Sequence, residues 1–153
     1  MIFQLLLGAA ALFSLVWIIQ IKNKFVKWMT IAAAVTTGIS LLPYSIPSKD
    51  GFIGYLLVQL VILFYTFSPN DYTNRKRAFI TVALLFPGIC MALELTAYRG
   101  NVIAALACVI SIAAFLNVIM KEREVFKDEI GLMAVPFAHS VVRITLAIIG
   151  FTQ

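Results

Sequence analysis

The sequence predicts an all-α integral membrane protein, a bundle of about six transmembrane helices joined by short loops. Three observations predict this fold class. Apolar residues make up 62% of the 153 residues and charged residues 12%, with a mean hydropathy of +1.00, which is far outside the range of a soluble domain. The apolar residues fall into six runs, and the basic residues cluster between these runs. At this length, we expect residues 1–153 to form a single polytopic domain.

Each of the six apolar runs is close to the roughly 20 residues that a helix needs to cross about 30 Å of hydrocarbon. Because the connections between the runs are short, consecutive helices are expected to run antiparallel as neighbours. The transmembrane helices are predicted at 1–21, 28–44, 52–67, 78–97, 102–120 and 130–151.

The first three runs have clear chemical boundaries. Run 1–21 follows no basic segment and is long enough to span a bilayer, so we expect a retained helix and not a signal peptide. It ends at Lys22-Asn23-Lys24, and the second run ends where segment 43–51 carries two prolines. Because a proline disrupts a helix interior, the third run is predicted to begin at Phe52.

The last three runs are separated by polar segments. Segment 68–77 contains turn-forming residues and then a basic triplet, which suits a loop at the membrane surface, and segment 98–101 is a short polar break. Segment 121–129 alternates in charge, and we expect it to extend the fifth helix by a turn or two into water. A docking point for a soluble partner is the alternative interpretation of this segment.

The distribution of lysine and arginine predicts the orientation, since cytoplasmic loops are enriched in both. The second and fourth loops carry only Lys49 and Arg99. We therefore expect the first, third and fifth loops in the cytoplasm and both termini outside, in the plasma (inner) membrane. With this orientation, we expect the basic residues behind the net charge of +5 to contact lipid phosphates and not nucleic acid. The three basic loops carry Lys22, Lys24, Lys27, Arg75, Lys76, Arg77, Lys121, Arg123 and Lys127.

Aromatic residues are expected at the membrane boundaries, where amphipathic rings prefer the headgroup region. Trp17 is the exception, because it falls inside a predicted span. The boundary group comprises Trp28, Tyr44, Tyr55, Tyr65, Tyr72 and Tyr98.

Small residues mark the surfaces where helices can approach closely. Gly8–Ala11 and Ser14 form such a face on the first helix, which packs either within the bundle or against a second subunit. Cys90 and Cys108 lie in apolar runs, without a CxxC pair or a nearby histidine. We therefore predict that both cysteines are small core residues and not metal ligands.

Three ionisable side chains are predicted to lie inside the bilayer, where each needs a partner or water. Counted from the cytoplasmic helix ends at about 1.5 Å per residue, His139 lies about 14 Å deep, Arg143 about 20 Å and Glu94 about 24 Å. His139 and Arg143 are four residues apart and therefore share a helix face. These depths predict an ion pair between Glu94 and Arg143, with Gln59 as a further partner and Ser111 near His139.

This polar group supports two interpretations. In the first, Glu94 and Arg143 form a self-satisfied pair that fixes helix register. In the second, a site in the outer half of the membrane binds a small polar or anionic solute or relays a proton, and His139 changes charge near neutral pH. Pro87-Gly88 and Pro136 open their helices beside these residues, as a gate would require, although inert membrane helices also tolerate prolines.

The sequence argues against several enzyme classes. A single histidine cannot supply two axial haem ligands, no lysine lies in mid-helix, and neither an HExxH nor a GxSxG motif occurs, so no cofactor is expected. We predict a module or subunit in membrane transport or in a larger membrane complex, with partner subunits or a second copy of the chain. A purely structural assembly subunit is the alternative, and a membrane-embedded enzyme is the third interpretation.

Overall fold

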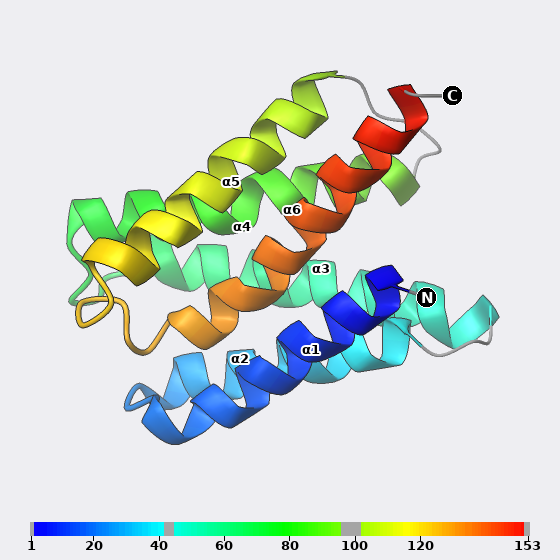
Figure 1. Cartoon of the computed structure of the whole chain (residues 1–153). Coiled ribbons are helices and arrows are strands. Elements are labelled where there is room, and N and C mark those ends of the chain that lie inside the picture. The colour runs from blue at the N-terminus through cyan, green and yellow to red at the C-terminus, as the bar shows by residue number, and fades with distance from the viewer. Residues whose placement is uncertain (1, 42–44, 96–101, 152–153) are drawn as a thin grey trace.

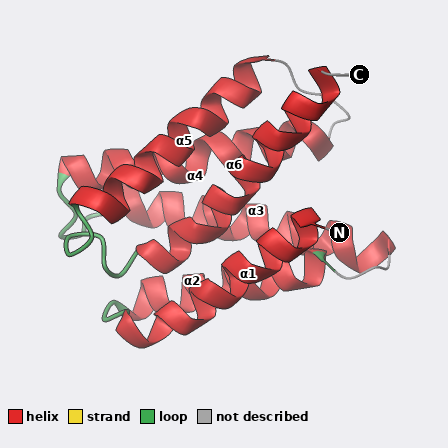
Figure 2. Cartoon of the chain, viewed as in Figure 1, coloured by secondary structure: helices red, strands yellow, loops and turns green. Residues whose placement is uncertain are grey.

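The computed structural model describes residues 2–41, 45–95 and 102–151, and within these ranges it describes the side chains outside 45–52, 90–95, 102–104, 147 and 150–151. The described chain consists of helices and the loops that join them, without a strand among the described residues (Figure 2). A short 3-10 turn, η1 (Ile18–Gln20), follows the first of six α-helices. The α-helices are α1 (Ile2–Trp17), α2 (Lys24–Ser40), α3 (Ser45–Phe67), α4 (Asn74–Leu95), α5 (Val102–Lys121) and α6 (Ile130–Phe151).

The all-α prediction and the number of helices are confirmed for the described residues, but several helix boundaries differ from the prediction. α2 begins at Lys24 and α4 at Asn74, four residues before their apolar runs, because polar residues at a membrane surface can continue a helix. α3 begins at Ser45, so the predicted break does not extend as far as Gly51. α5 ends at Lys121, and the predicted helical extension beyond it is wrong.

One segment, Ile2–Gln20, is long and apolar enough among the described residues to cross a membrane. By the same criteria, the described parts of three other helices contain shorter apolar stretches. These stretches lie at Ile53–Phe67, Ala105–Lys121 and Ile130–Leu146.

Helices that follow one another in the chain pack side by side, and α6 packs back against α1, so that the bundle closes (Figure 1). α6 also contacts α2 and α4, which makes it the central helix. The loops 21–23, 68–73 and 122–129 lie at one end of the bundle, and both termini lie toward the other end (Figure 1). We call the first of these the loop end.

The first half of α6 forms the centre of the core. The Ser14 hydroxyl of α1 donates a hydrogen bond of 2.6 Å to the Gly131 carbonyl of α6. A Cβ atom at Gly131 would lie 3.2 Å from the Trp17 Cβ and 3.3 Å from the Thr30 Cγ2, so glycine is what allows α6 to approach α1 and α2. The small face around Ser14 therefore packs within the bundle, and the nearby Ala11 is also buried.

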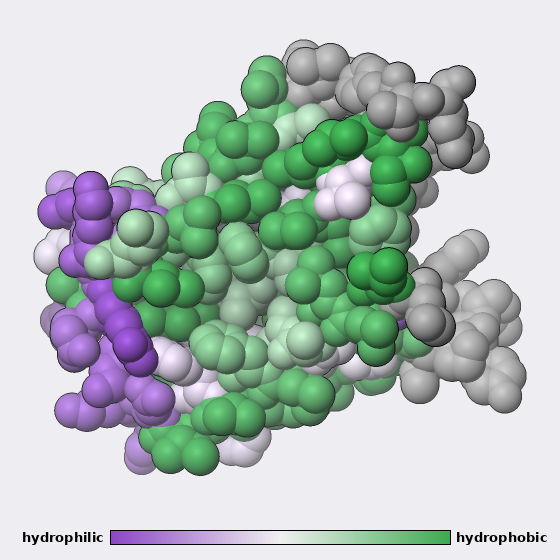
Figure 3. All heavy atoms as spheres, in the orientation of Figure 1, coloured by the Kyte–Doolittle hydropathy of each residue, from purple (hydrophilic) through white to green (hydrophobic). Residues whose placement is uncertain are grey.

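The surface of the bundle is far more apolar than that of a soluble protein, and the core is largely apolar as well. Large apolar residues on the outside include Ile19 and Phe64, which are 86% and 80% exposed. On the face that Figure 3 shows, apolar residues cover most of the described surface, and the hydrophilic residues gather at the loop end. The buried polar side chains include Ser14, Thr30, Thr37, Gln59, Thr66, Ser111, Glu129 and Ser140.

Candidate functional site

The three basic loops are bound to one another at the loop end. The Asp128 carboxylate accepts hydrogen bonds from the backbone N–H groups of Lys22 and Asn23, at 3.0 and 2.9 Å. The Asn23 side chain accepts from the Phe25 and Val26 N–H groups and so caps α2, while its amide nitrogen donates to the Tyr65 hydroxyl at 2.9 Å. The first and fifth loops are thereby fixed to the end of α3.

A buried carboxylate is the centre of this end. Glu129 is 1% exposed, and its Oε1 accepts a hydrogen bond of 2.7 Å from the Tyr72 hydroxyl. The Lys76 ammonium lies 2.9 Å from Glu129 Oε2, in an ion pair without the alignment of a hydrogen bond, and donates to the Val125 carbonyl at 3.0 Å. We call Tyr72, Lys76 and Glu129 the loop-end cluster.

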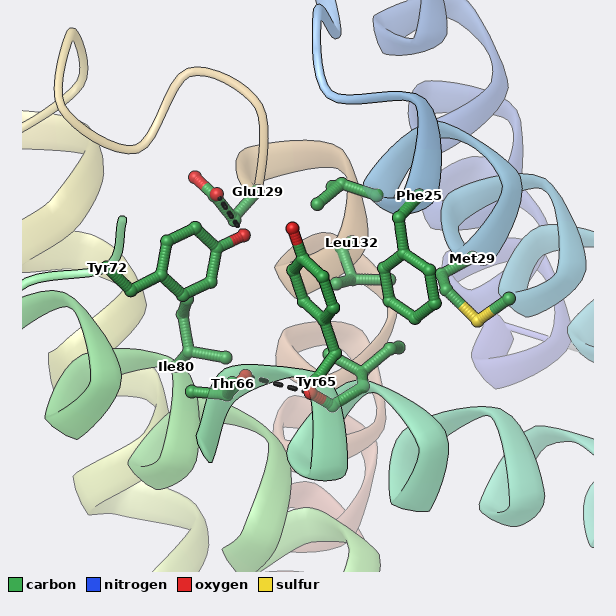
Figure 4. Close-up of a pocket in the computed structure, with 10 residues that line it drawn as sticks. Phe25, Met29, Tyr65, Thr66, Tyr72, Ile80, Glu129 and Leu132 are labelled. Atoms are coloured by element: carbon green, nitrogen blue, oxygen red, sulfur yellow. Dashed lines mark hydrogen bonds between the residues drawn. The ribbon is translucent and has the colours of Figure 1, made fainter. Parts of the chain in front are cut away.

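Aromatic side chains cover the loop-end cluster on its inner side. Tyr65 stacks on Phe25 with ring centroids 4.1 Å apart and meets Tyr72 edge to face at 5.7 Å (Figure 4). Burial and the neighbouring Glu129 carboxylate raise the pKa of the Tyr72 phenol well above its ordinary value. Tyr72 therefore stays a hydrogen-bond donor to Glu129 through the neutral range.

Segment 122–129 is not the solvated helix end that the sequence predicts. Its residues form turns, and Phe126 is fully buried beneath them, with its ring against Phe79. The Trp17 indole N–H donates to the Lys127 carbonyl at 2.7 Å, and the Arg123 guanidinium lies 5.5 Å from the Trp17 ring centroid. Trp17 is the last residue of α1 and lies at the loop end. There the Lys127 carbonyl and the Arg123 guanidinium provide polar partners for its indole ring.

A second polar group, which we call the mid-bundle cluster, comprises Tyr55, Gln59 and His139. The Gln59 amide nitrogen donates a hydrogen bond of 2.9 Å to the Tyr55 hydroxyl, and the Tyr55 ring lies 5.2 Å from the His139 ring, centroid to centroid. Tyr55 is 2% exposed and Gln59 3% exposed, whereas His139 is partly buried. The structure therefore joins two predicted site residues, Gln59 and His139, through a tyrosine.

Gln59 also contacts α4 at the glycine that follows Pro87. A Cβ atom at Gly88 would lie 2.6 Å from Gln59 Oε1, so the amide fits because position 88 has no side chain. This oxygen is buried and accepts no hydrogen bond from a described residue. The mid-bundle cluster thus contains one buried acceptor without a donor among the described residues.

Ser111 has a different role from the one that its predicted position suggests. Its hydroxyl donates a hydrogen bond of 3.1 Å to the Ala83 carbonyl of α4. Pro87 lies four residues after Ala83 and has no N–H, so it cannot make the usual helical hydrogen bond to this carbonyl. The hydroxyl replaces the missing donor and joins α5 to α4.

The remaining predicted site residues lie toward the other end of the bundle. Arg143 is on α6, one turn beyond His139, and its side chain is partly buried. The Glu94 backbone belongs to α4, but its side chain lies outside the described residues, and so does the predicted Glu94–Arg143 pair.

Two functional candidates were missed by sequence reasoning. Tyr55 was predicted at a membrane boundary, but α3 begins at Ser45, which places Tyr55 nearly three turns inside the helix. The sequence places Glu129 in a solvated loop, whereas the structure buries it against Tyr72 and Lys76. These partners are distant in sequence, so no local pattern predicts the contact. The one available signal for Glu129 was its position next to the apolar run that begins at Ile130.

The described residues contain no group of three or more His, Cys, Asp or Glu side chains that could hold a metal ion. Cys108 is buried, and the Cys90 side chain is outside the described residues. No protein-family model, curated protein or solved structure matches the chain. The two clusters and the surface of the bundle are therefore the basis for a functional proposal.

Proposed function

We propose that the chain is a six-span integral membrane protein of the plasma (inner) membrane that acts as a module or subunit in membrane transport or in a larger membrane complex. The observation that carries the proposal is the large apolar surface of the bundle, together with buried polar side chains such as Gln59 and Glu129. A soluble protein rarely exposes so large a contiguous apolar surface. In a bilayer the same surface is solvated by lipid tails.

The lengths of the helices support this proposal. Helices α3 to α6 contain 20 to 23 residues each, which corresponds to about 30–35 Å at 1.5 Å per residue. The hydrocarbon core of a bilayer is about 30 Å thick. α1 with η1 covers 19 residues, and α2 covers 17, at the lower limit of the range for a span.

The loop end supports a cytoplasmic assignment for the first, third and fifth loops. These loops lie together, and the loops with the adjoining helix ends contain nine of the twelve lysine and arginine residues of the chain. Clustered lysine and arginine favour the cytoplasmic leaflet, which carries anionic lipids. The termini are then outside. By helical rise, Gln59 and His139 of the mid-bundle cluster lie about 12–14 Å from the loop end, and Tyr55 lies about 18 Å from it.

The mid-bundle cluster favours a role in transport over a purely structural role. His139 is an ionisable side chain in the interior of a proposed span, and such residues commonly mark solute or proton pathways. Pro136 and Pro87 interrupt α6 and α4 beside the cluster. A small polar or anionic solute is the ligand class that an imidazole, an amide and the nearby Arg143 would bind.

A structural assembly subunit is the second candidate, because other buried polar groups serve helix packing. The Ser14 and Ser111 hydroxyls each donate to the carbonyl of another helix, and the Thr30 hydroxyl donates to a carbonyl of its own helix. Hydrogen bonds of this kind specify how membrane helices associate. A membrane-embedded enzyme is the third candidate.

Purification from membranes and reconstitution into liposomes would test the proposal. The fraction that resists alkaline extraction reports insertion, and uptake of radiolabelled inorganic phosphate, acetate and a set of amino acids reports transport. A transport module should take up at least one probe, and His139→Leu should abolish that uptake in a folded protein. Stoichiometric co-purification of another membrane protein, without uptake, would favour the structural role, and lipid turnover would favour the enzyme.

The variant pair Glu94→Leu with Arg143→Leu separates the first two candidates. If the two side chains only fix helix register, replacing both should preserve folding and activity together. If they contact a solute, the double variant should fold, but uptake should be lost.

The alkaline extraction assay tests membrane insertion separately. Extraction of the natural chain by alkali would contradict the proposed membrane insertion.

A further inference from the structure

A groove of about 370 Å³ runs between α4 and α5 on the outside of the bundle. Three alanines help to hollow it, Ala78 on α4 with Ala113 and Ala114 on α5. Ala78 and Ala113 are exposed, so the groove opens toward the surroundings of the bundle and not into the core. We call it the α4–α5 groove, and its other lining residues are Phe79, Val82, Ile110 and Asn117.

The α4–α5 groove lies in the half of the bundle that adjoins the loop end. At about 1.5 Å per residue, Asn117 lies about 6 Å and Ile110 about 16 Å from the end of α5 at Lys121. Ala78 lies about 6 Å from the beginning of α4 at Asn74. Because one leaflet contributes half of the roughly 30 Å of hydrocarbon, the groove matches a single leaflet in depth.

Asn117 is the one polar side chain that lines the groove. It is partly exposed, and its amide makes no hydrogen bond to a described residue. Its position near the helix end corresponds to the boundary between the hydrocarbon and the headgroup region, where the ester carbonyls of phospholipids lie. The amide can therefore donate to a lipid that occupies the groove.

Two basic residues stand at the loop-end mouth of the groove. Lys121 follows Asn117 by four residues and Arg75 precedes Ala78 by three, so each shares a helix face with a residue that lines the groove. Both are exposed. Arg75 forms an ion pair with Glu122, whereas Lys121 has no ion pair with a described residue. The mouth thus carries a net positive charge at the level of lipid headgroups.

We propose that the α4–α5 groove binds an anionic phospholipid from the leaflet at the loop end. One acyl chain lies along the groove over the alanines, the Asn117 amide donates to an ester carbonyl, and the Lys121 ammonium contacts the headgroup phosphate. An anionic lipid is favoured because its headgroup has no positive charge of its own to oppose Lys121. This proposal rests on the proposed membrane insertion, but neither on transport nor on the side that the loop end faces.

Two matched pairs of lipids test the contacts. Dioleoyl phosphatidylglycerol and dioleoyl phosphatidylcholine have the same chains but differ in headgroup charge, and the diether analogue of the phosphatidylglycerol lacks the ester carbonyls. Native mass spectrometry of the full chain in detergent counts the lipids bound at increasing lipid concentration. The first phosphatidylglycerol should bind about fivefold more tightly than phosphatidylcholine, as one basic residue near an anionic lipid predicts. The diether analogue should bind about threefold more weakly than the diester, because one hydrogen bond is lost.

Two polar variants assign these preferences to residues. Lys121→Gln should remove most of the preference for phosphatidylglycerol over phosphatidylcholine. Lys24→Gln is the matched control, because it removes an equally exposed positive charge at the loop end but on α2, away from the groove, and it should leave the preference unchanged. Asn117→Leu should abolish the difference between the diester and the diether lipid.

A third variant tests the groove itself. Ala113→Phe fills the groove from its exposed rim, and it should weaken the first phosphatidylglycerol at least fivefold. Leu106→Phe adds an aromatic ring at another exposed position of α5 outside the groove and should have no such effect. Since both positions are exposed, both variants should fold even if Asn117→Leu does not.

Several results would overturn the proposal. These are equal binding of the two headgroups, equal losses in Lys24→Gln and Lys121→Gln, or unchanged binding in Ala113→Phe. Small residues on a membrane helix also suit a second helix, so a dimer of the natural chain that Ala113→Phe dissociates would assign the groove to a second copy instead of a lipid.

The outcome can be separated from the proposed function. Membranes from the same preparation are tested for alkaline extraction before detergent is added. A chain that is firmly inserted but does not distinguish the two headgroups would contradict the lipid site alone. A chain that is extracted by alkali would contradict the membrane insertion on which the lipid site rests.

Discussion

Gly88→Ala tests the contact between α3 and α4 directly. The new methyl group would lie 2.6 Å from Gln59 Oε1, which is too short for a non-bonded contact. Gln59 is 3% exposed and its amide nitrogen is bonded to Tyr55, so turning the amide away from Gly88 toward the groove of about 190 Å³ between α3 and α4 would break this hydrogen bond. A lost hydrogen bond of this kind costs about 0.5–1.5 kcal/mol, and overpacking in a core costs about 1–3 kcal/mol.

Gly38→Ala provides the matched control. Gly38 lies in α2, and a Cβ atom there would meet nothing within 4 Å, so this substitution has only the gain of about 1 kcal/mol that alanine gives in a helix. We expect Gly88→Ala to be about 1–2 kcal/mol less stable than Gly38→Ala. Unfolding in mixed detergent micelles, followed by circular dichroism, measures this difference.

A double-mutant cycle identifies the cause. In a Gln59→Ala background the colliding atom is absent, so the difference between the two glycine substitutions should fall to within about 0.5 kcal/mol. Our account of this contact would be refuted if Gly88→Ala stabilised the protein as much as Gly38→Ala, or if the difference persisted without the Gln59 amide.

Three further predictions concern other hydrogen bonds. Ser111→Ala should destabilise the protein by about 1 kcal/mol, because it leaves the Ala83 carbonyl without a donor. Adding Pro87→Ala should recover part of this loss, because it restores a backbone N–H. Unfolding of the single and double variants measures both effects. The folded protein holds the pKa of Tyr72 above its unfolded value, so the neutral phenol contributes stability that is fully present below about pH 10 and is lost as the pH rises further. Tyr72→Phe should reduce this alkaline loss of stability in an unfolding series. Asn23→Ala removes the cap of α2 and should cost about 0.5–2 kcal/mol in the same unfolding assay, whereas Asn23→Asp should largely preserve it.

The helices could be predicted from the sequence because each apolar run is bounded by charged residues, glycine or proline. The run that ends at Phe67 is followed directly by a serine and a proline, and this boundary is confirmed. The start of α3 was predicted too late because a proline near a helix start is compatible with helical geometry, since the first N–H groups have no partner within the helix. Pro47 is the third residue of α3.

The sites were less predictable because they depend on contacts between distant residues. Helical depth alone could place Gln59 and His139 inside the bundle, but not the Tyr55 side chain between them. The sequence predicts Ser111 as a polar residue inside the bundle, but it does not predict the partner of Ser111. The hydroxyl donates to the Ala83 carbonyl, which Pro87 leaves without a backbone donor, and a backbone group cannot be recognised from residue types. The burial of Glu129 required knowledge of how the third and fifth loops meet.

The orientation of the loop end is the most direct test of the proposed membrane topology. In a background with Cys90→Ser and Cys108→Ala, single cysteines are introduced by Lys24→Cys, Asp71→Cys and Glu124→Cys, all at exposed positions of the loop end. A membrane-impermeant maleimide should label all three in inverted vesicles and none in intact cells, while tags at both termini should be accessible from outside. Labelling of all three cysteines in intact cells, with protected termini, would contradict the proposed orientation, and labelling of only one or two of them would contradict the six-span arrangement.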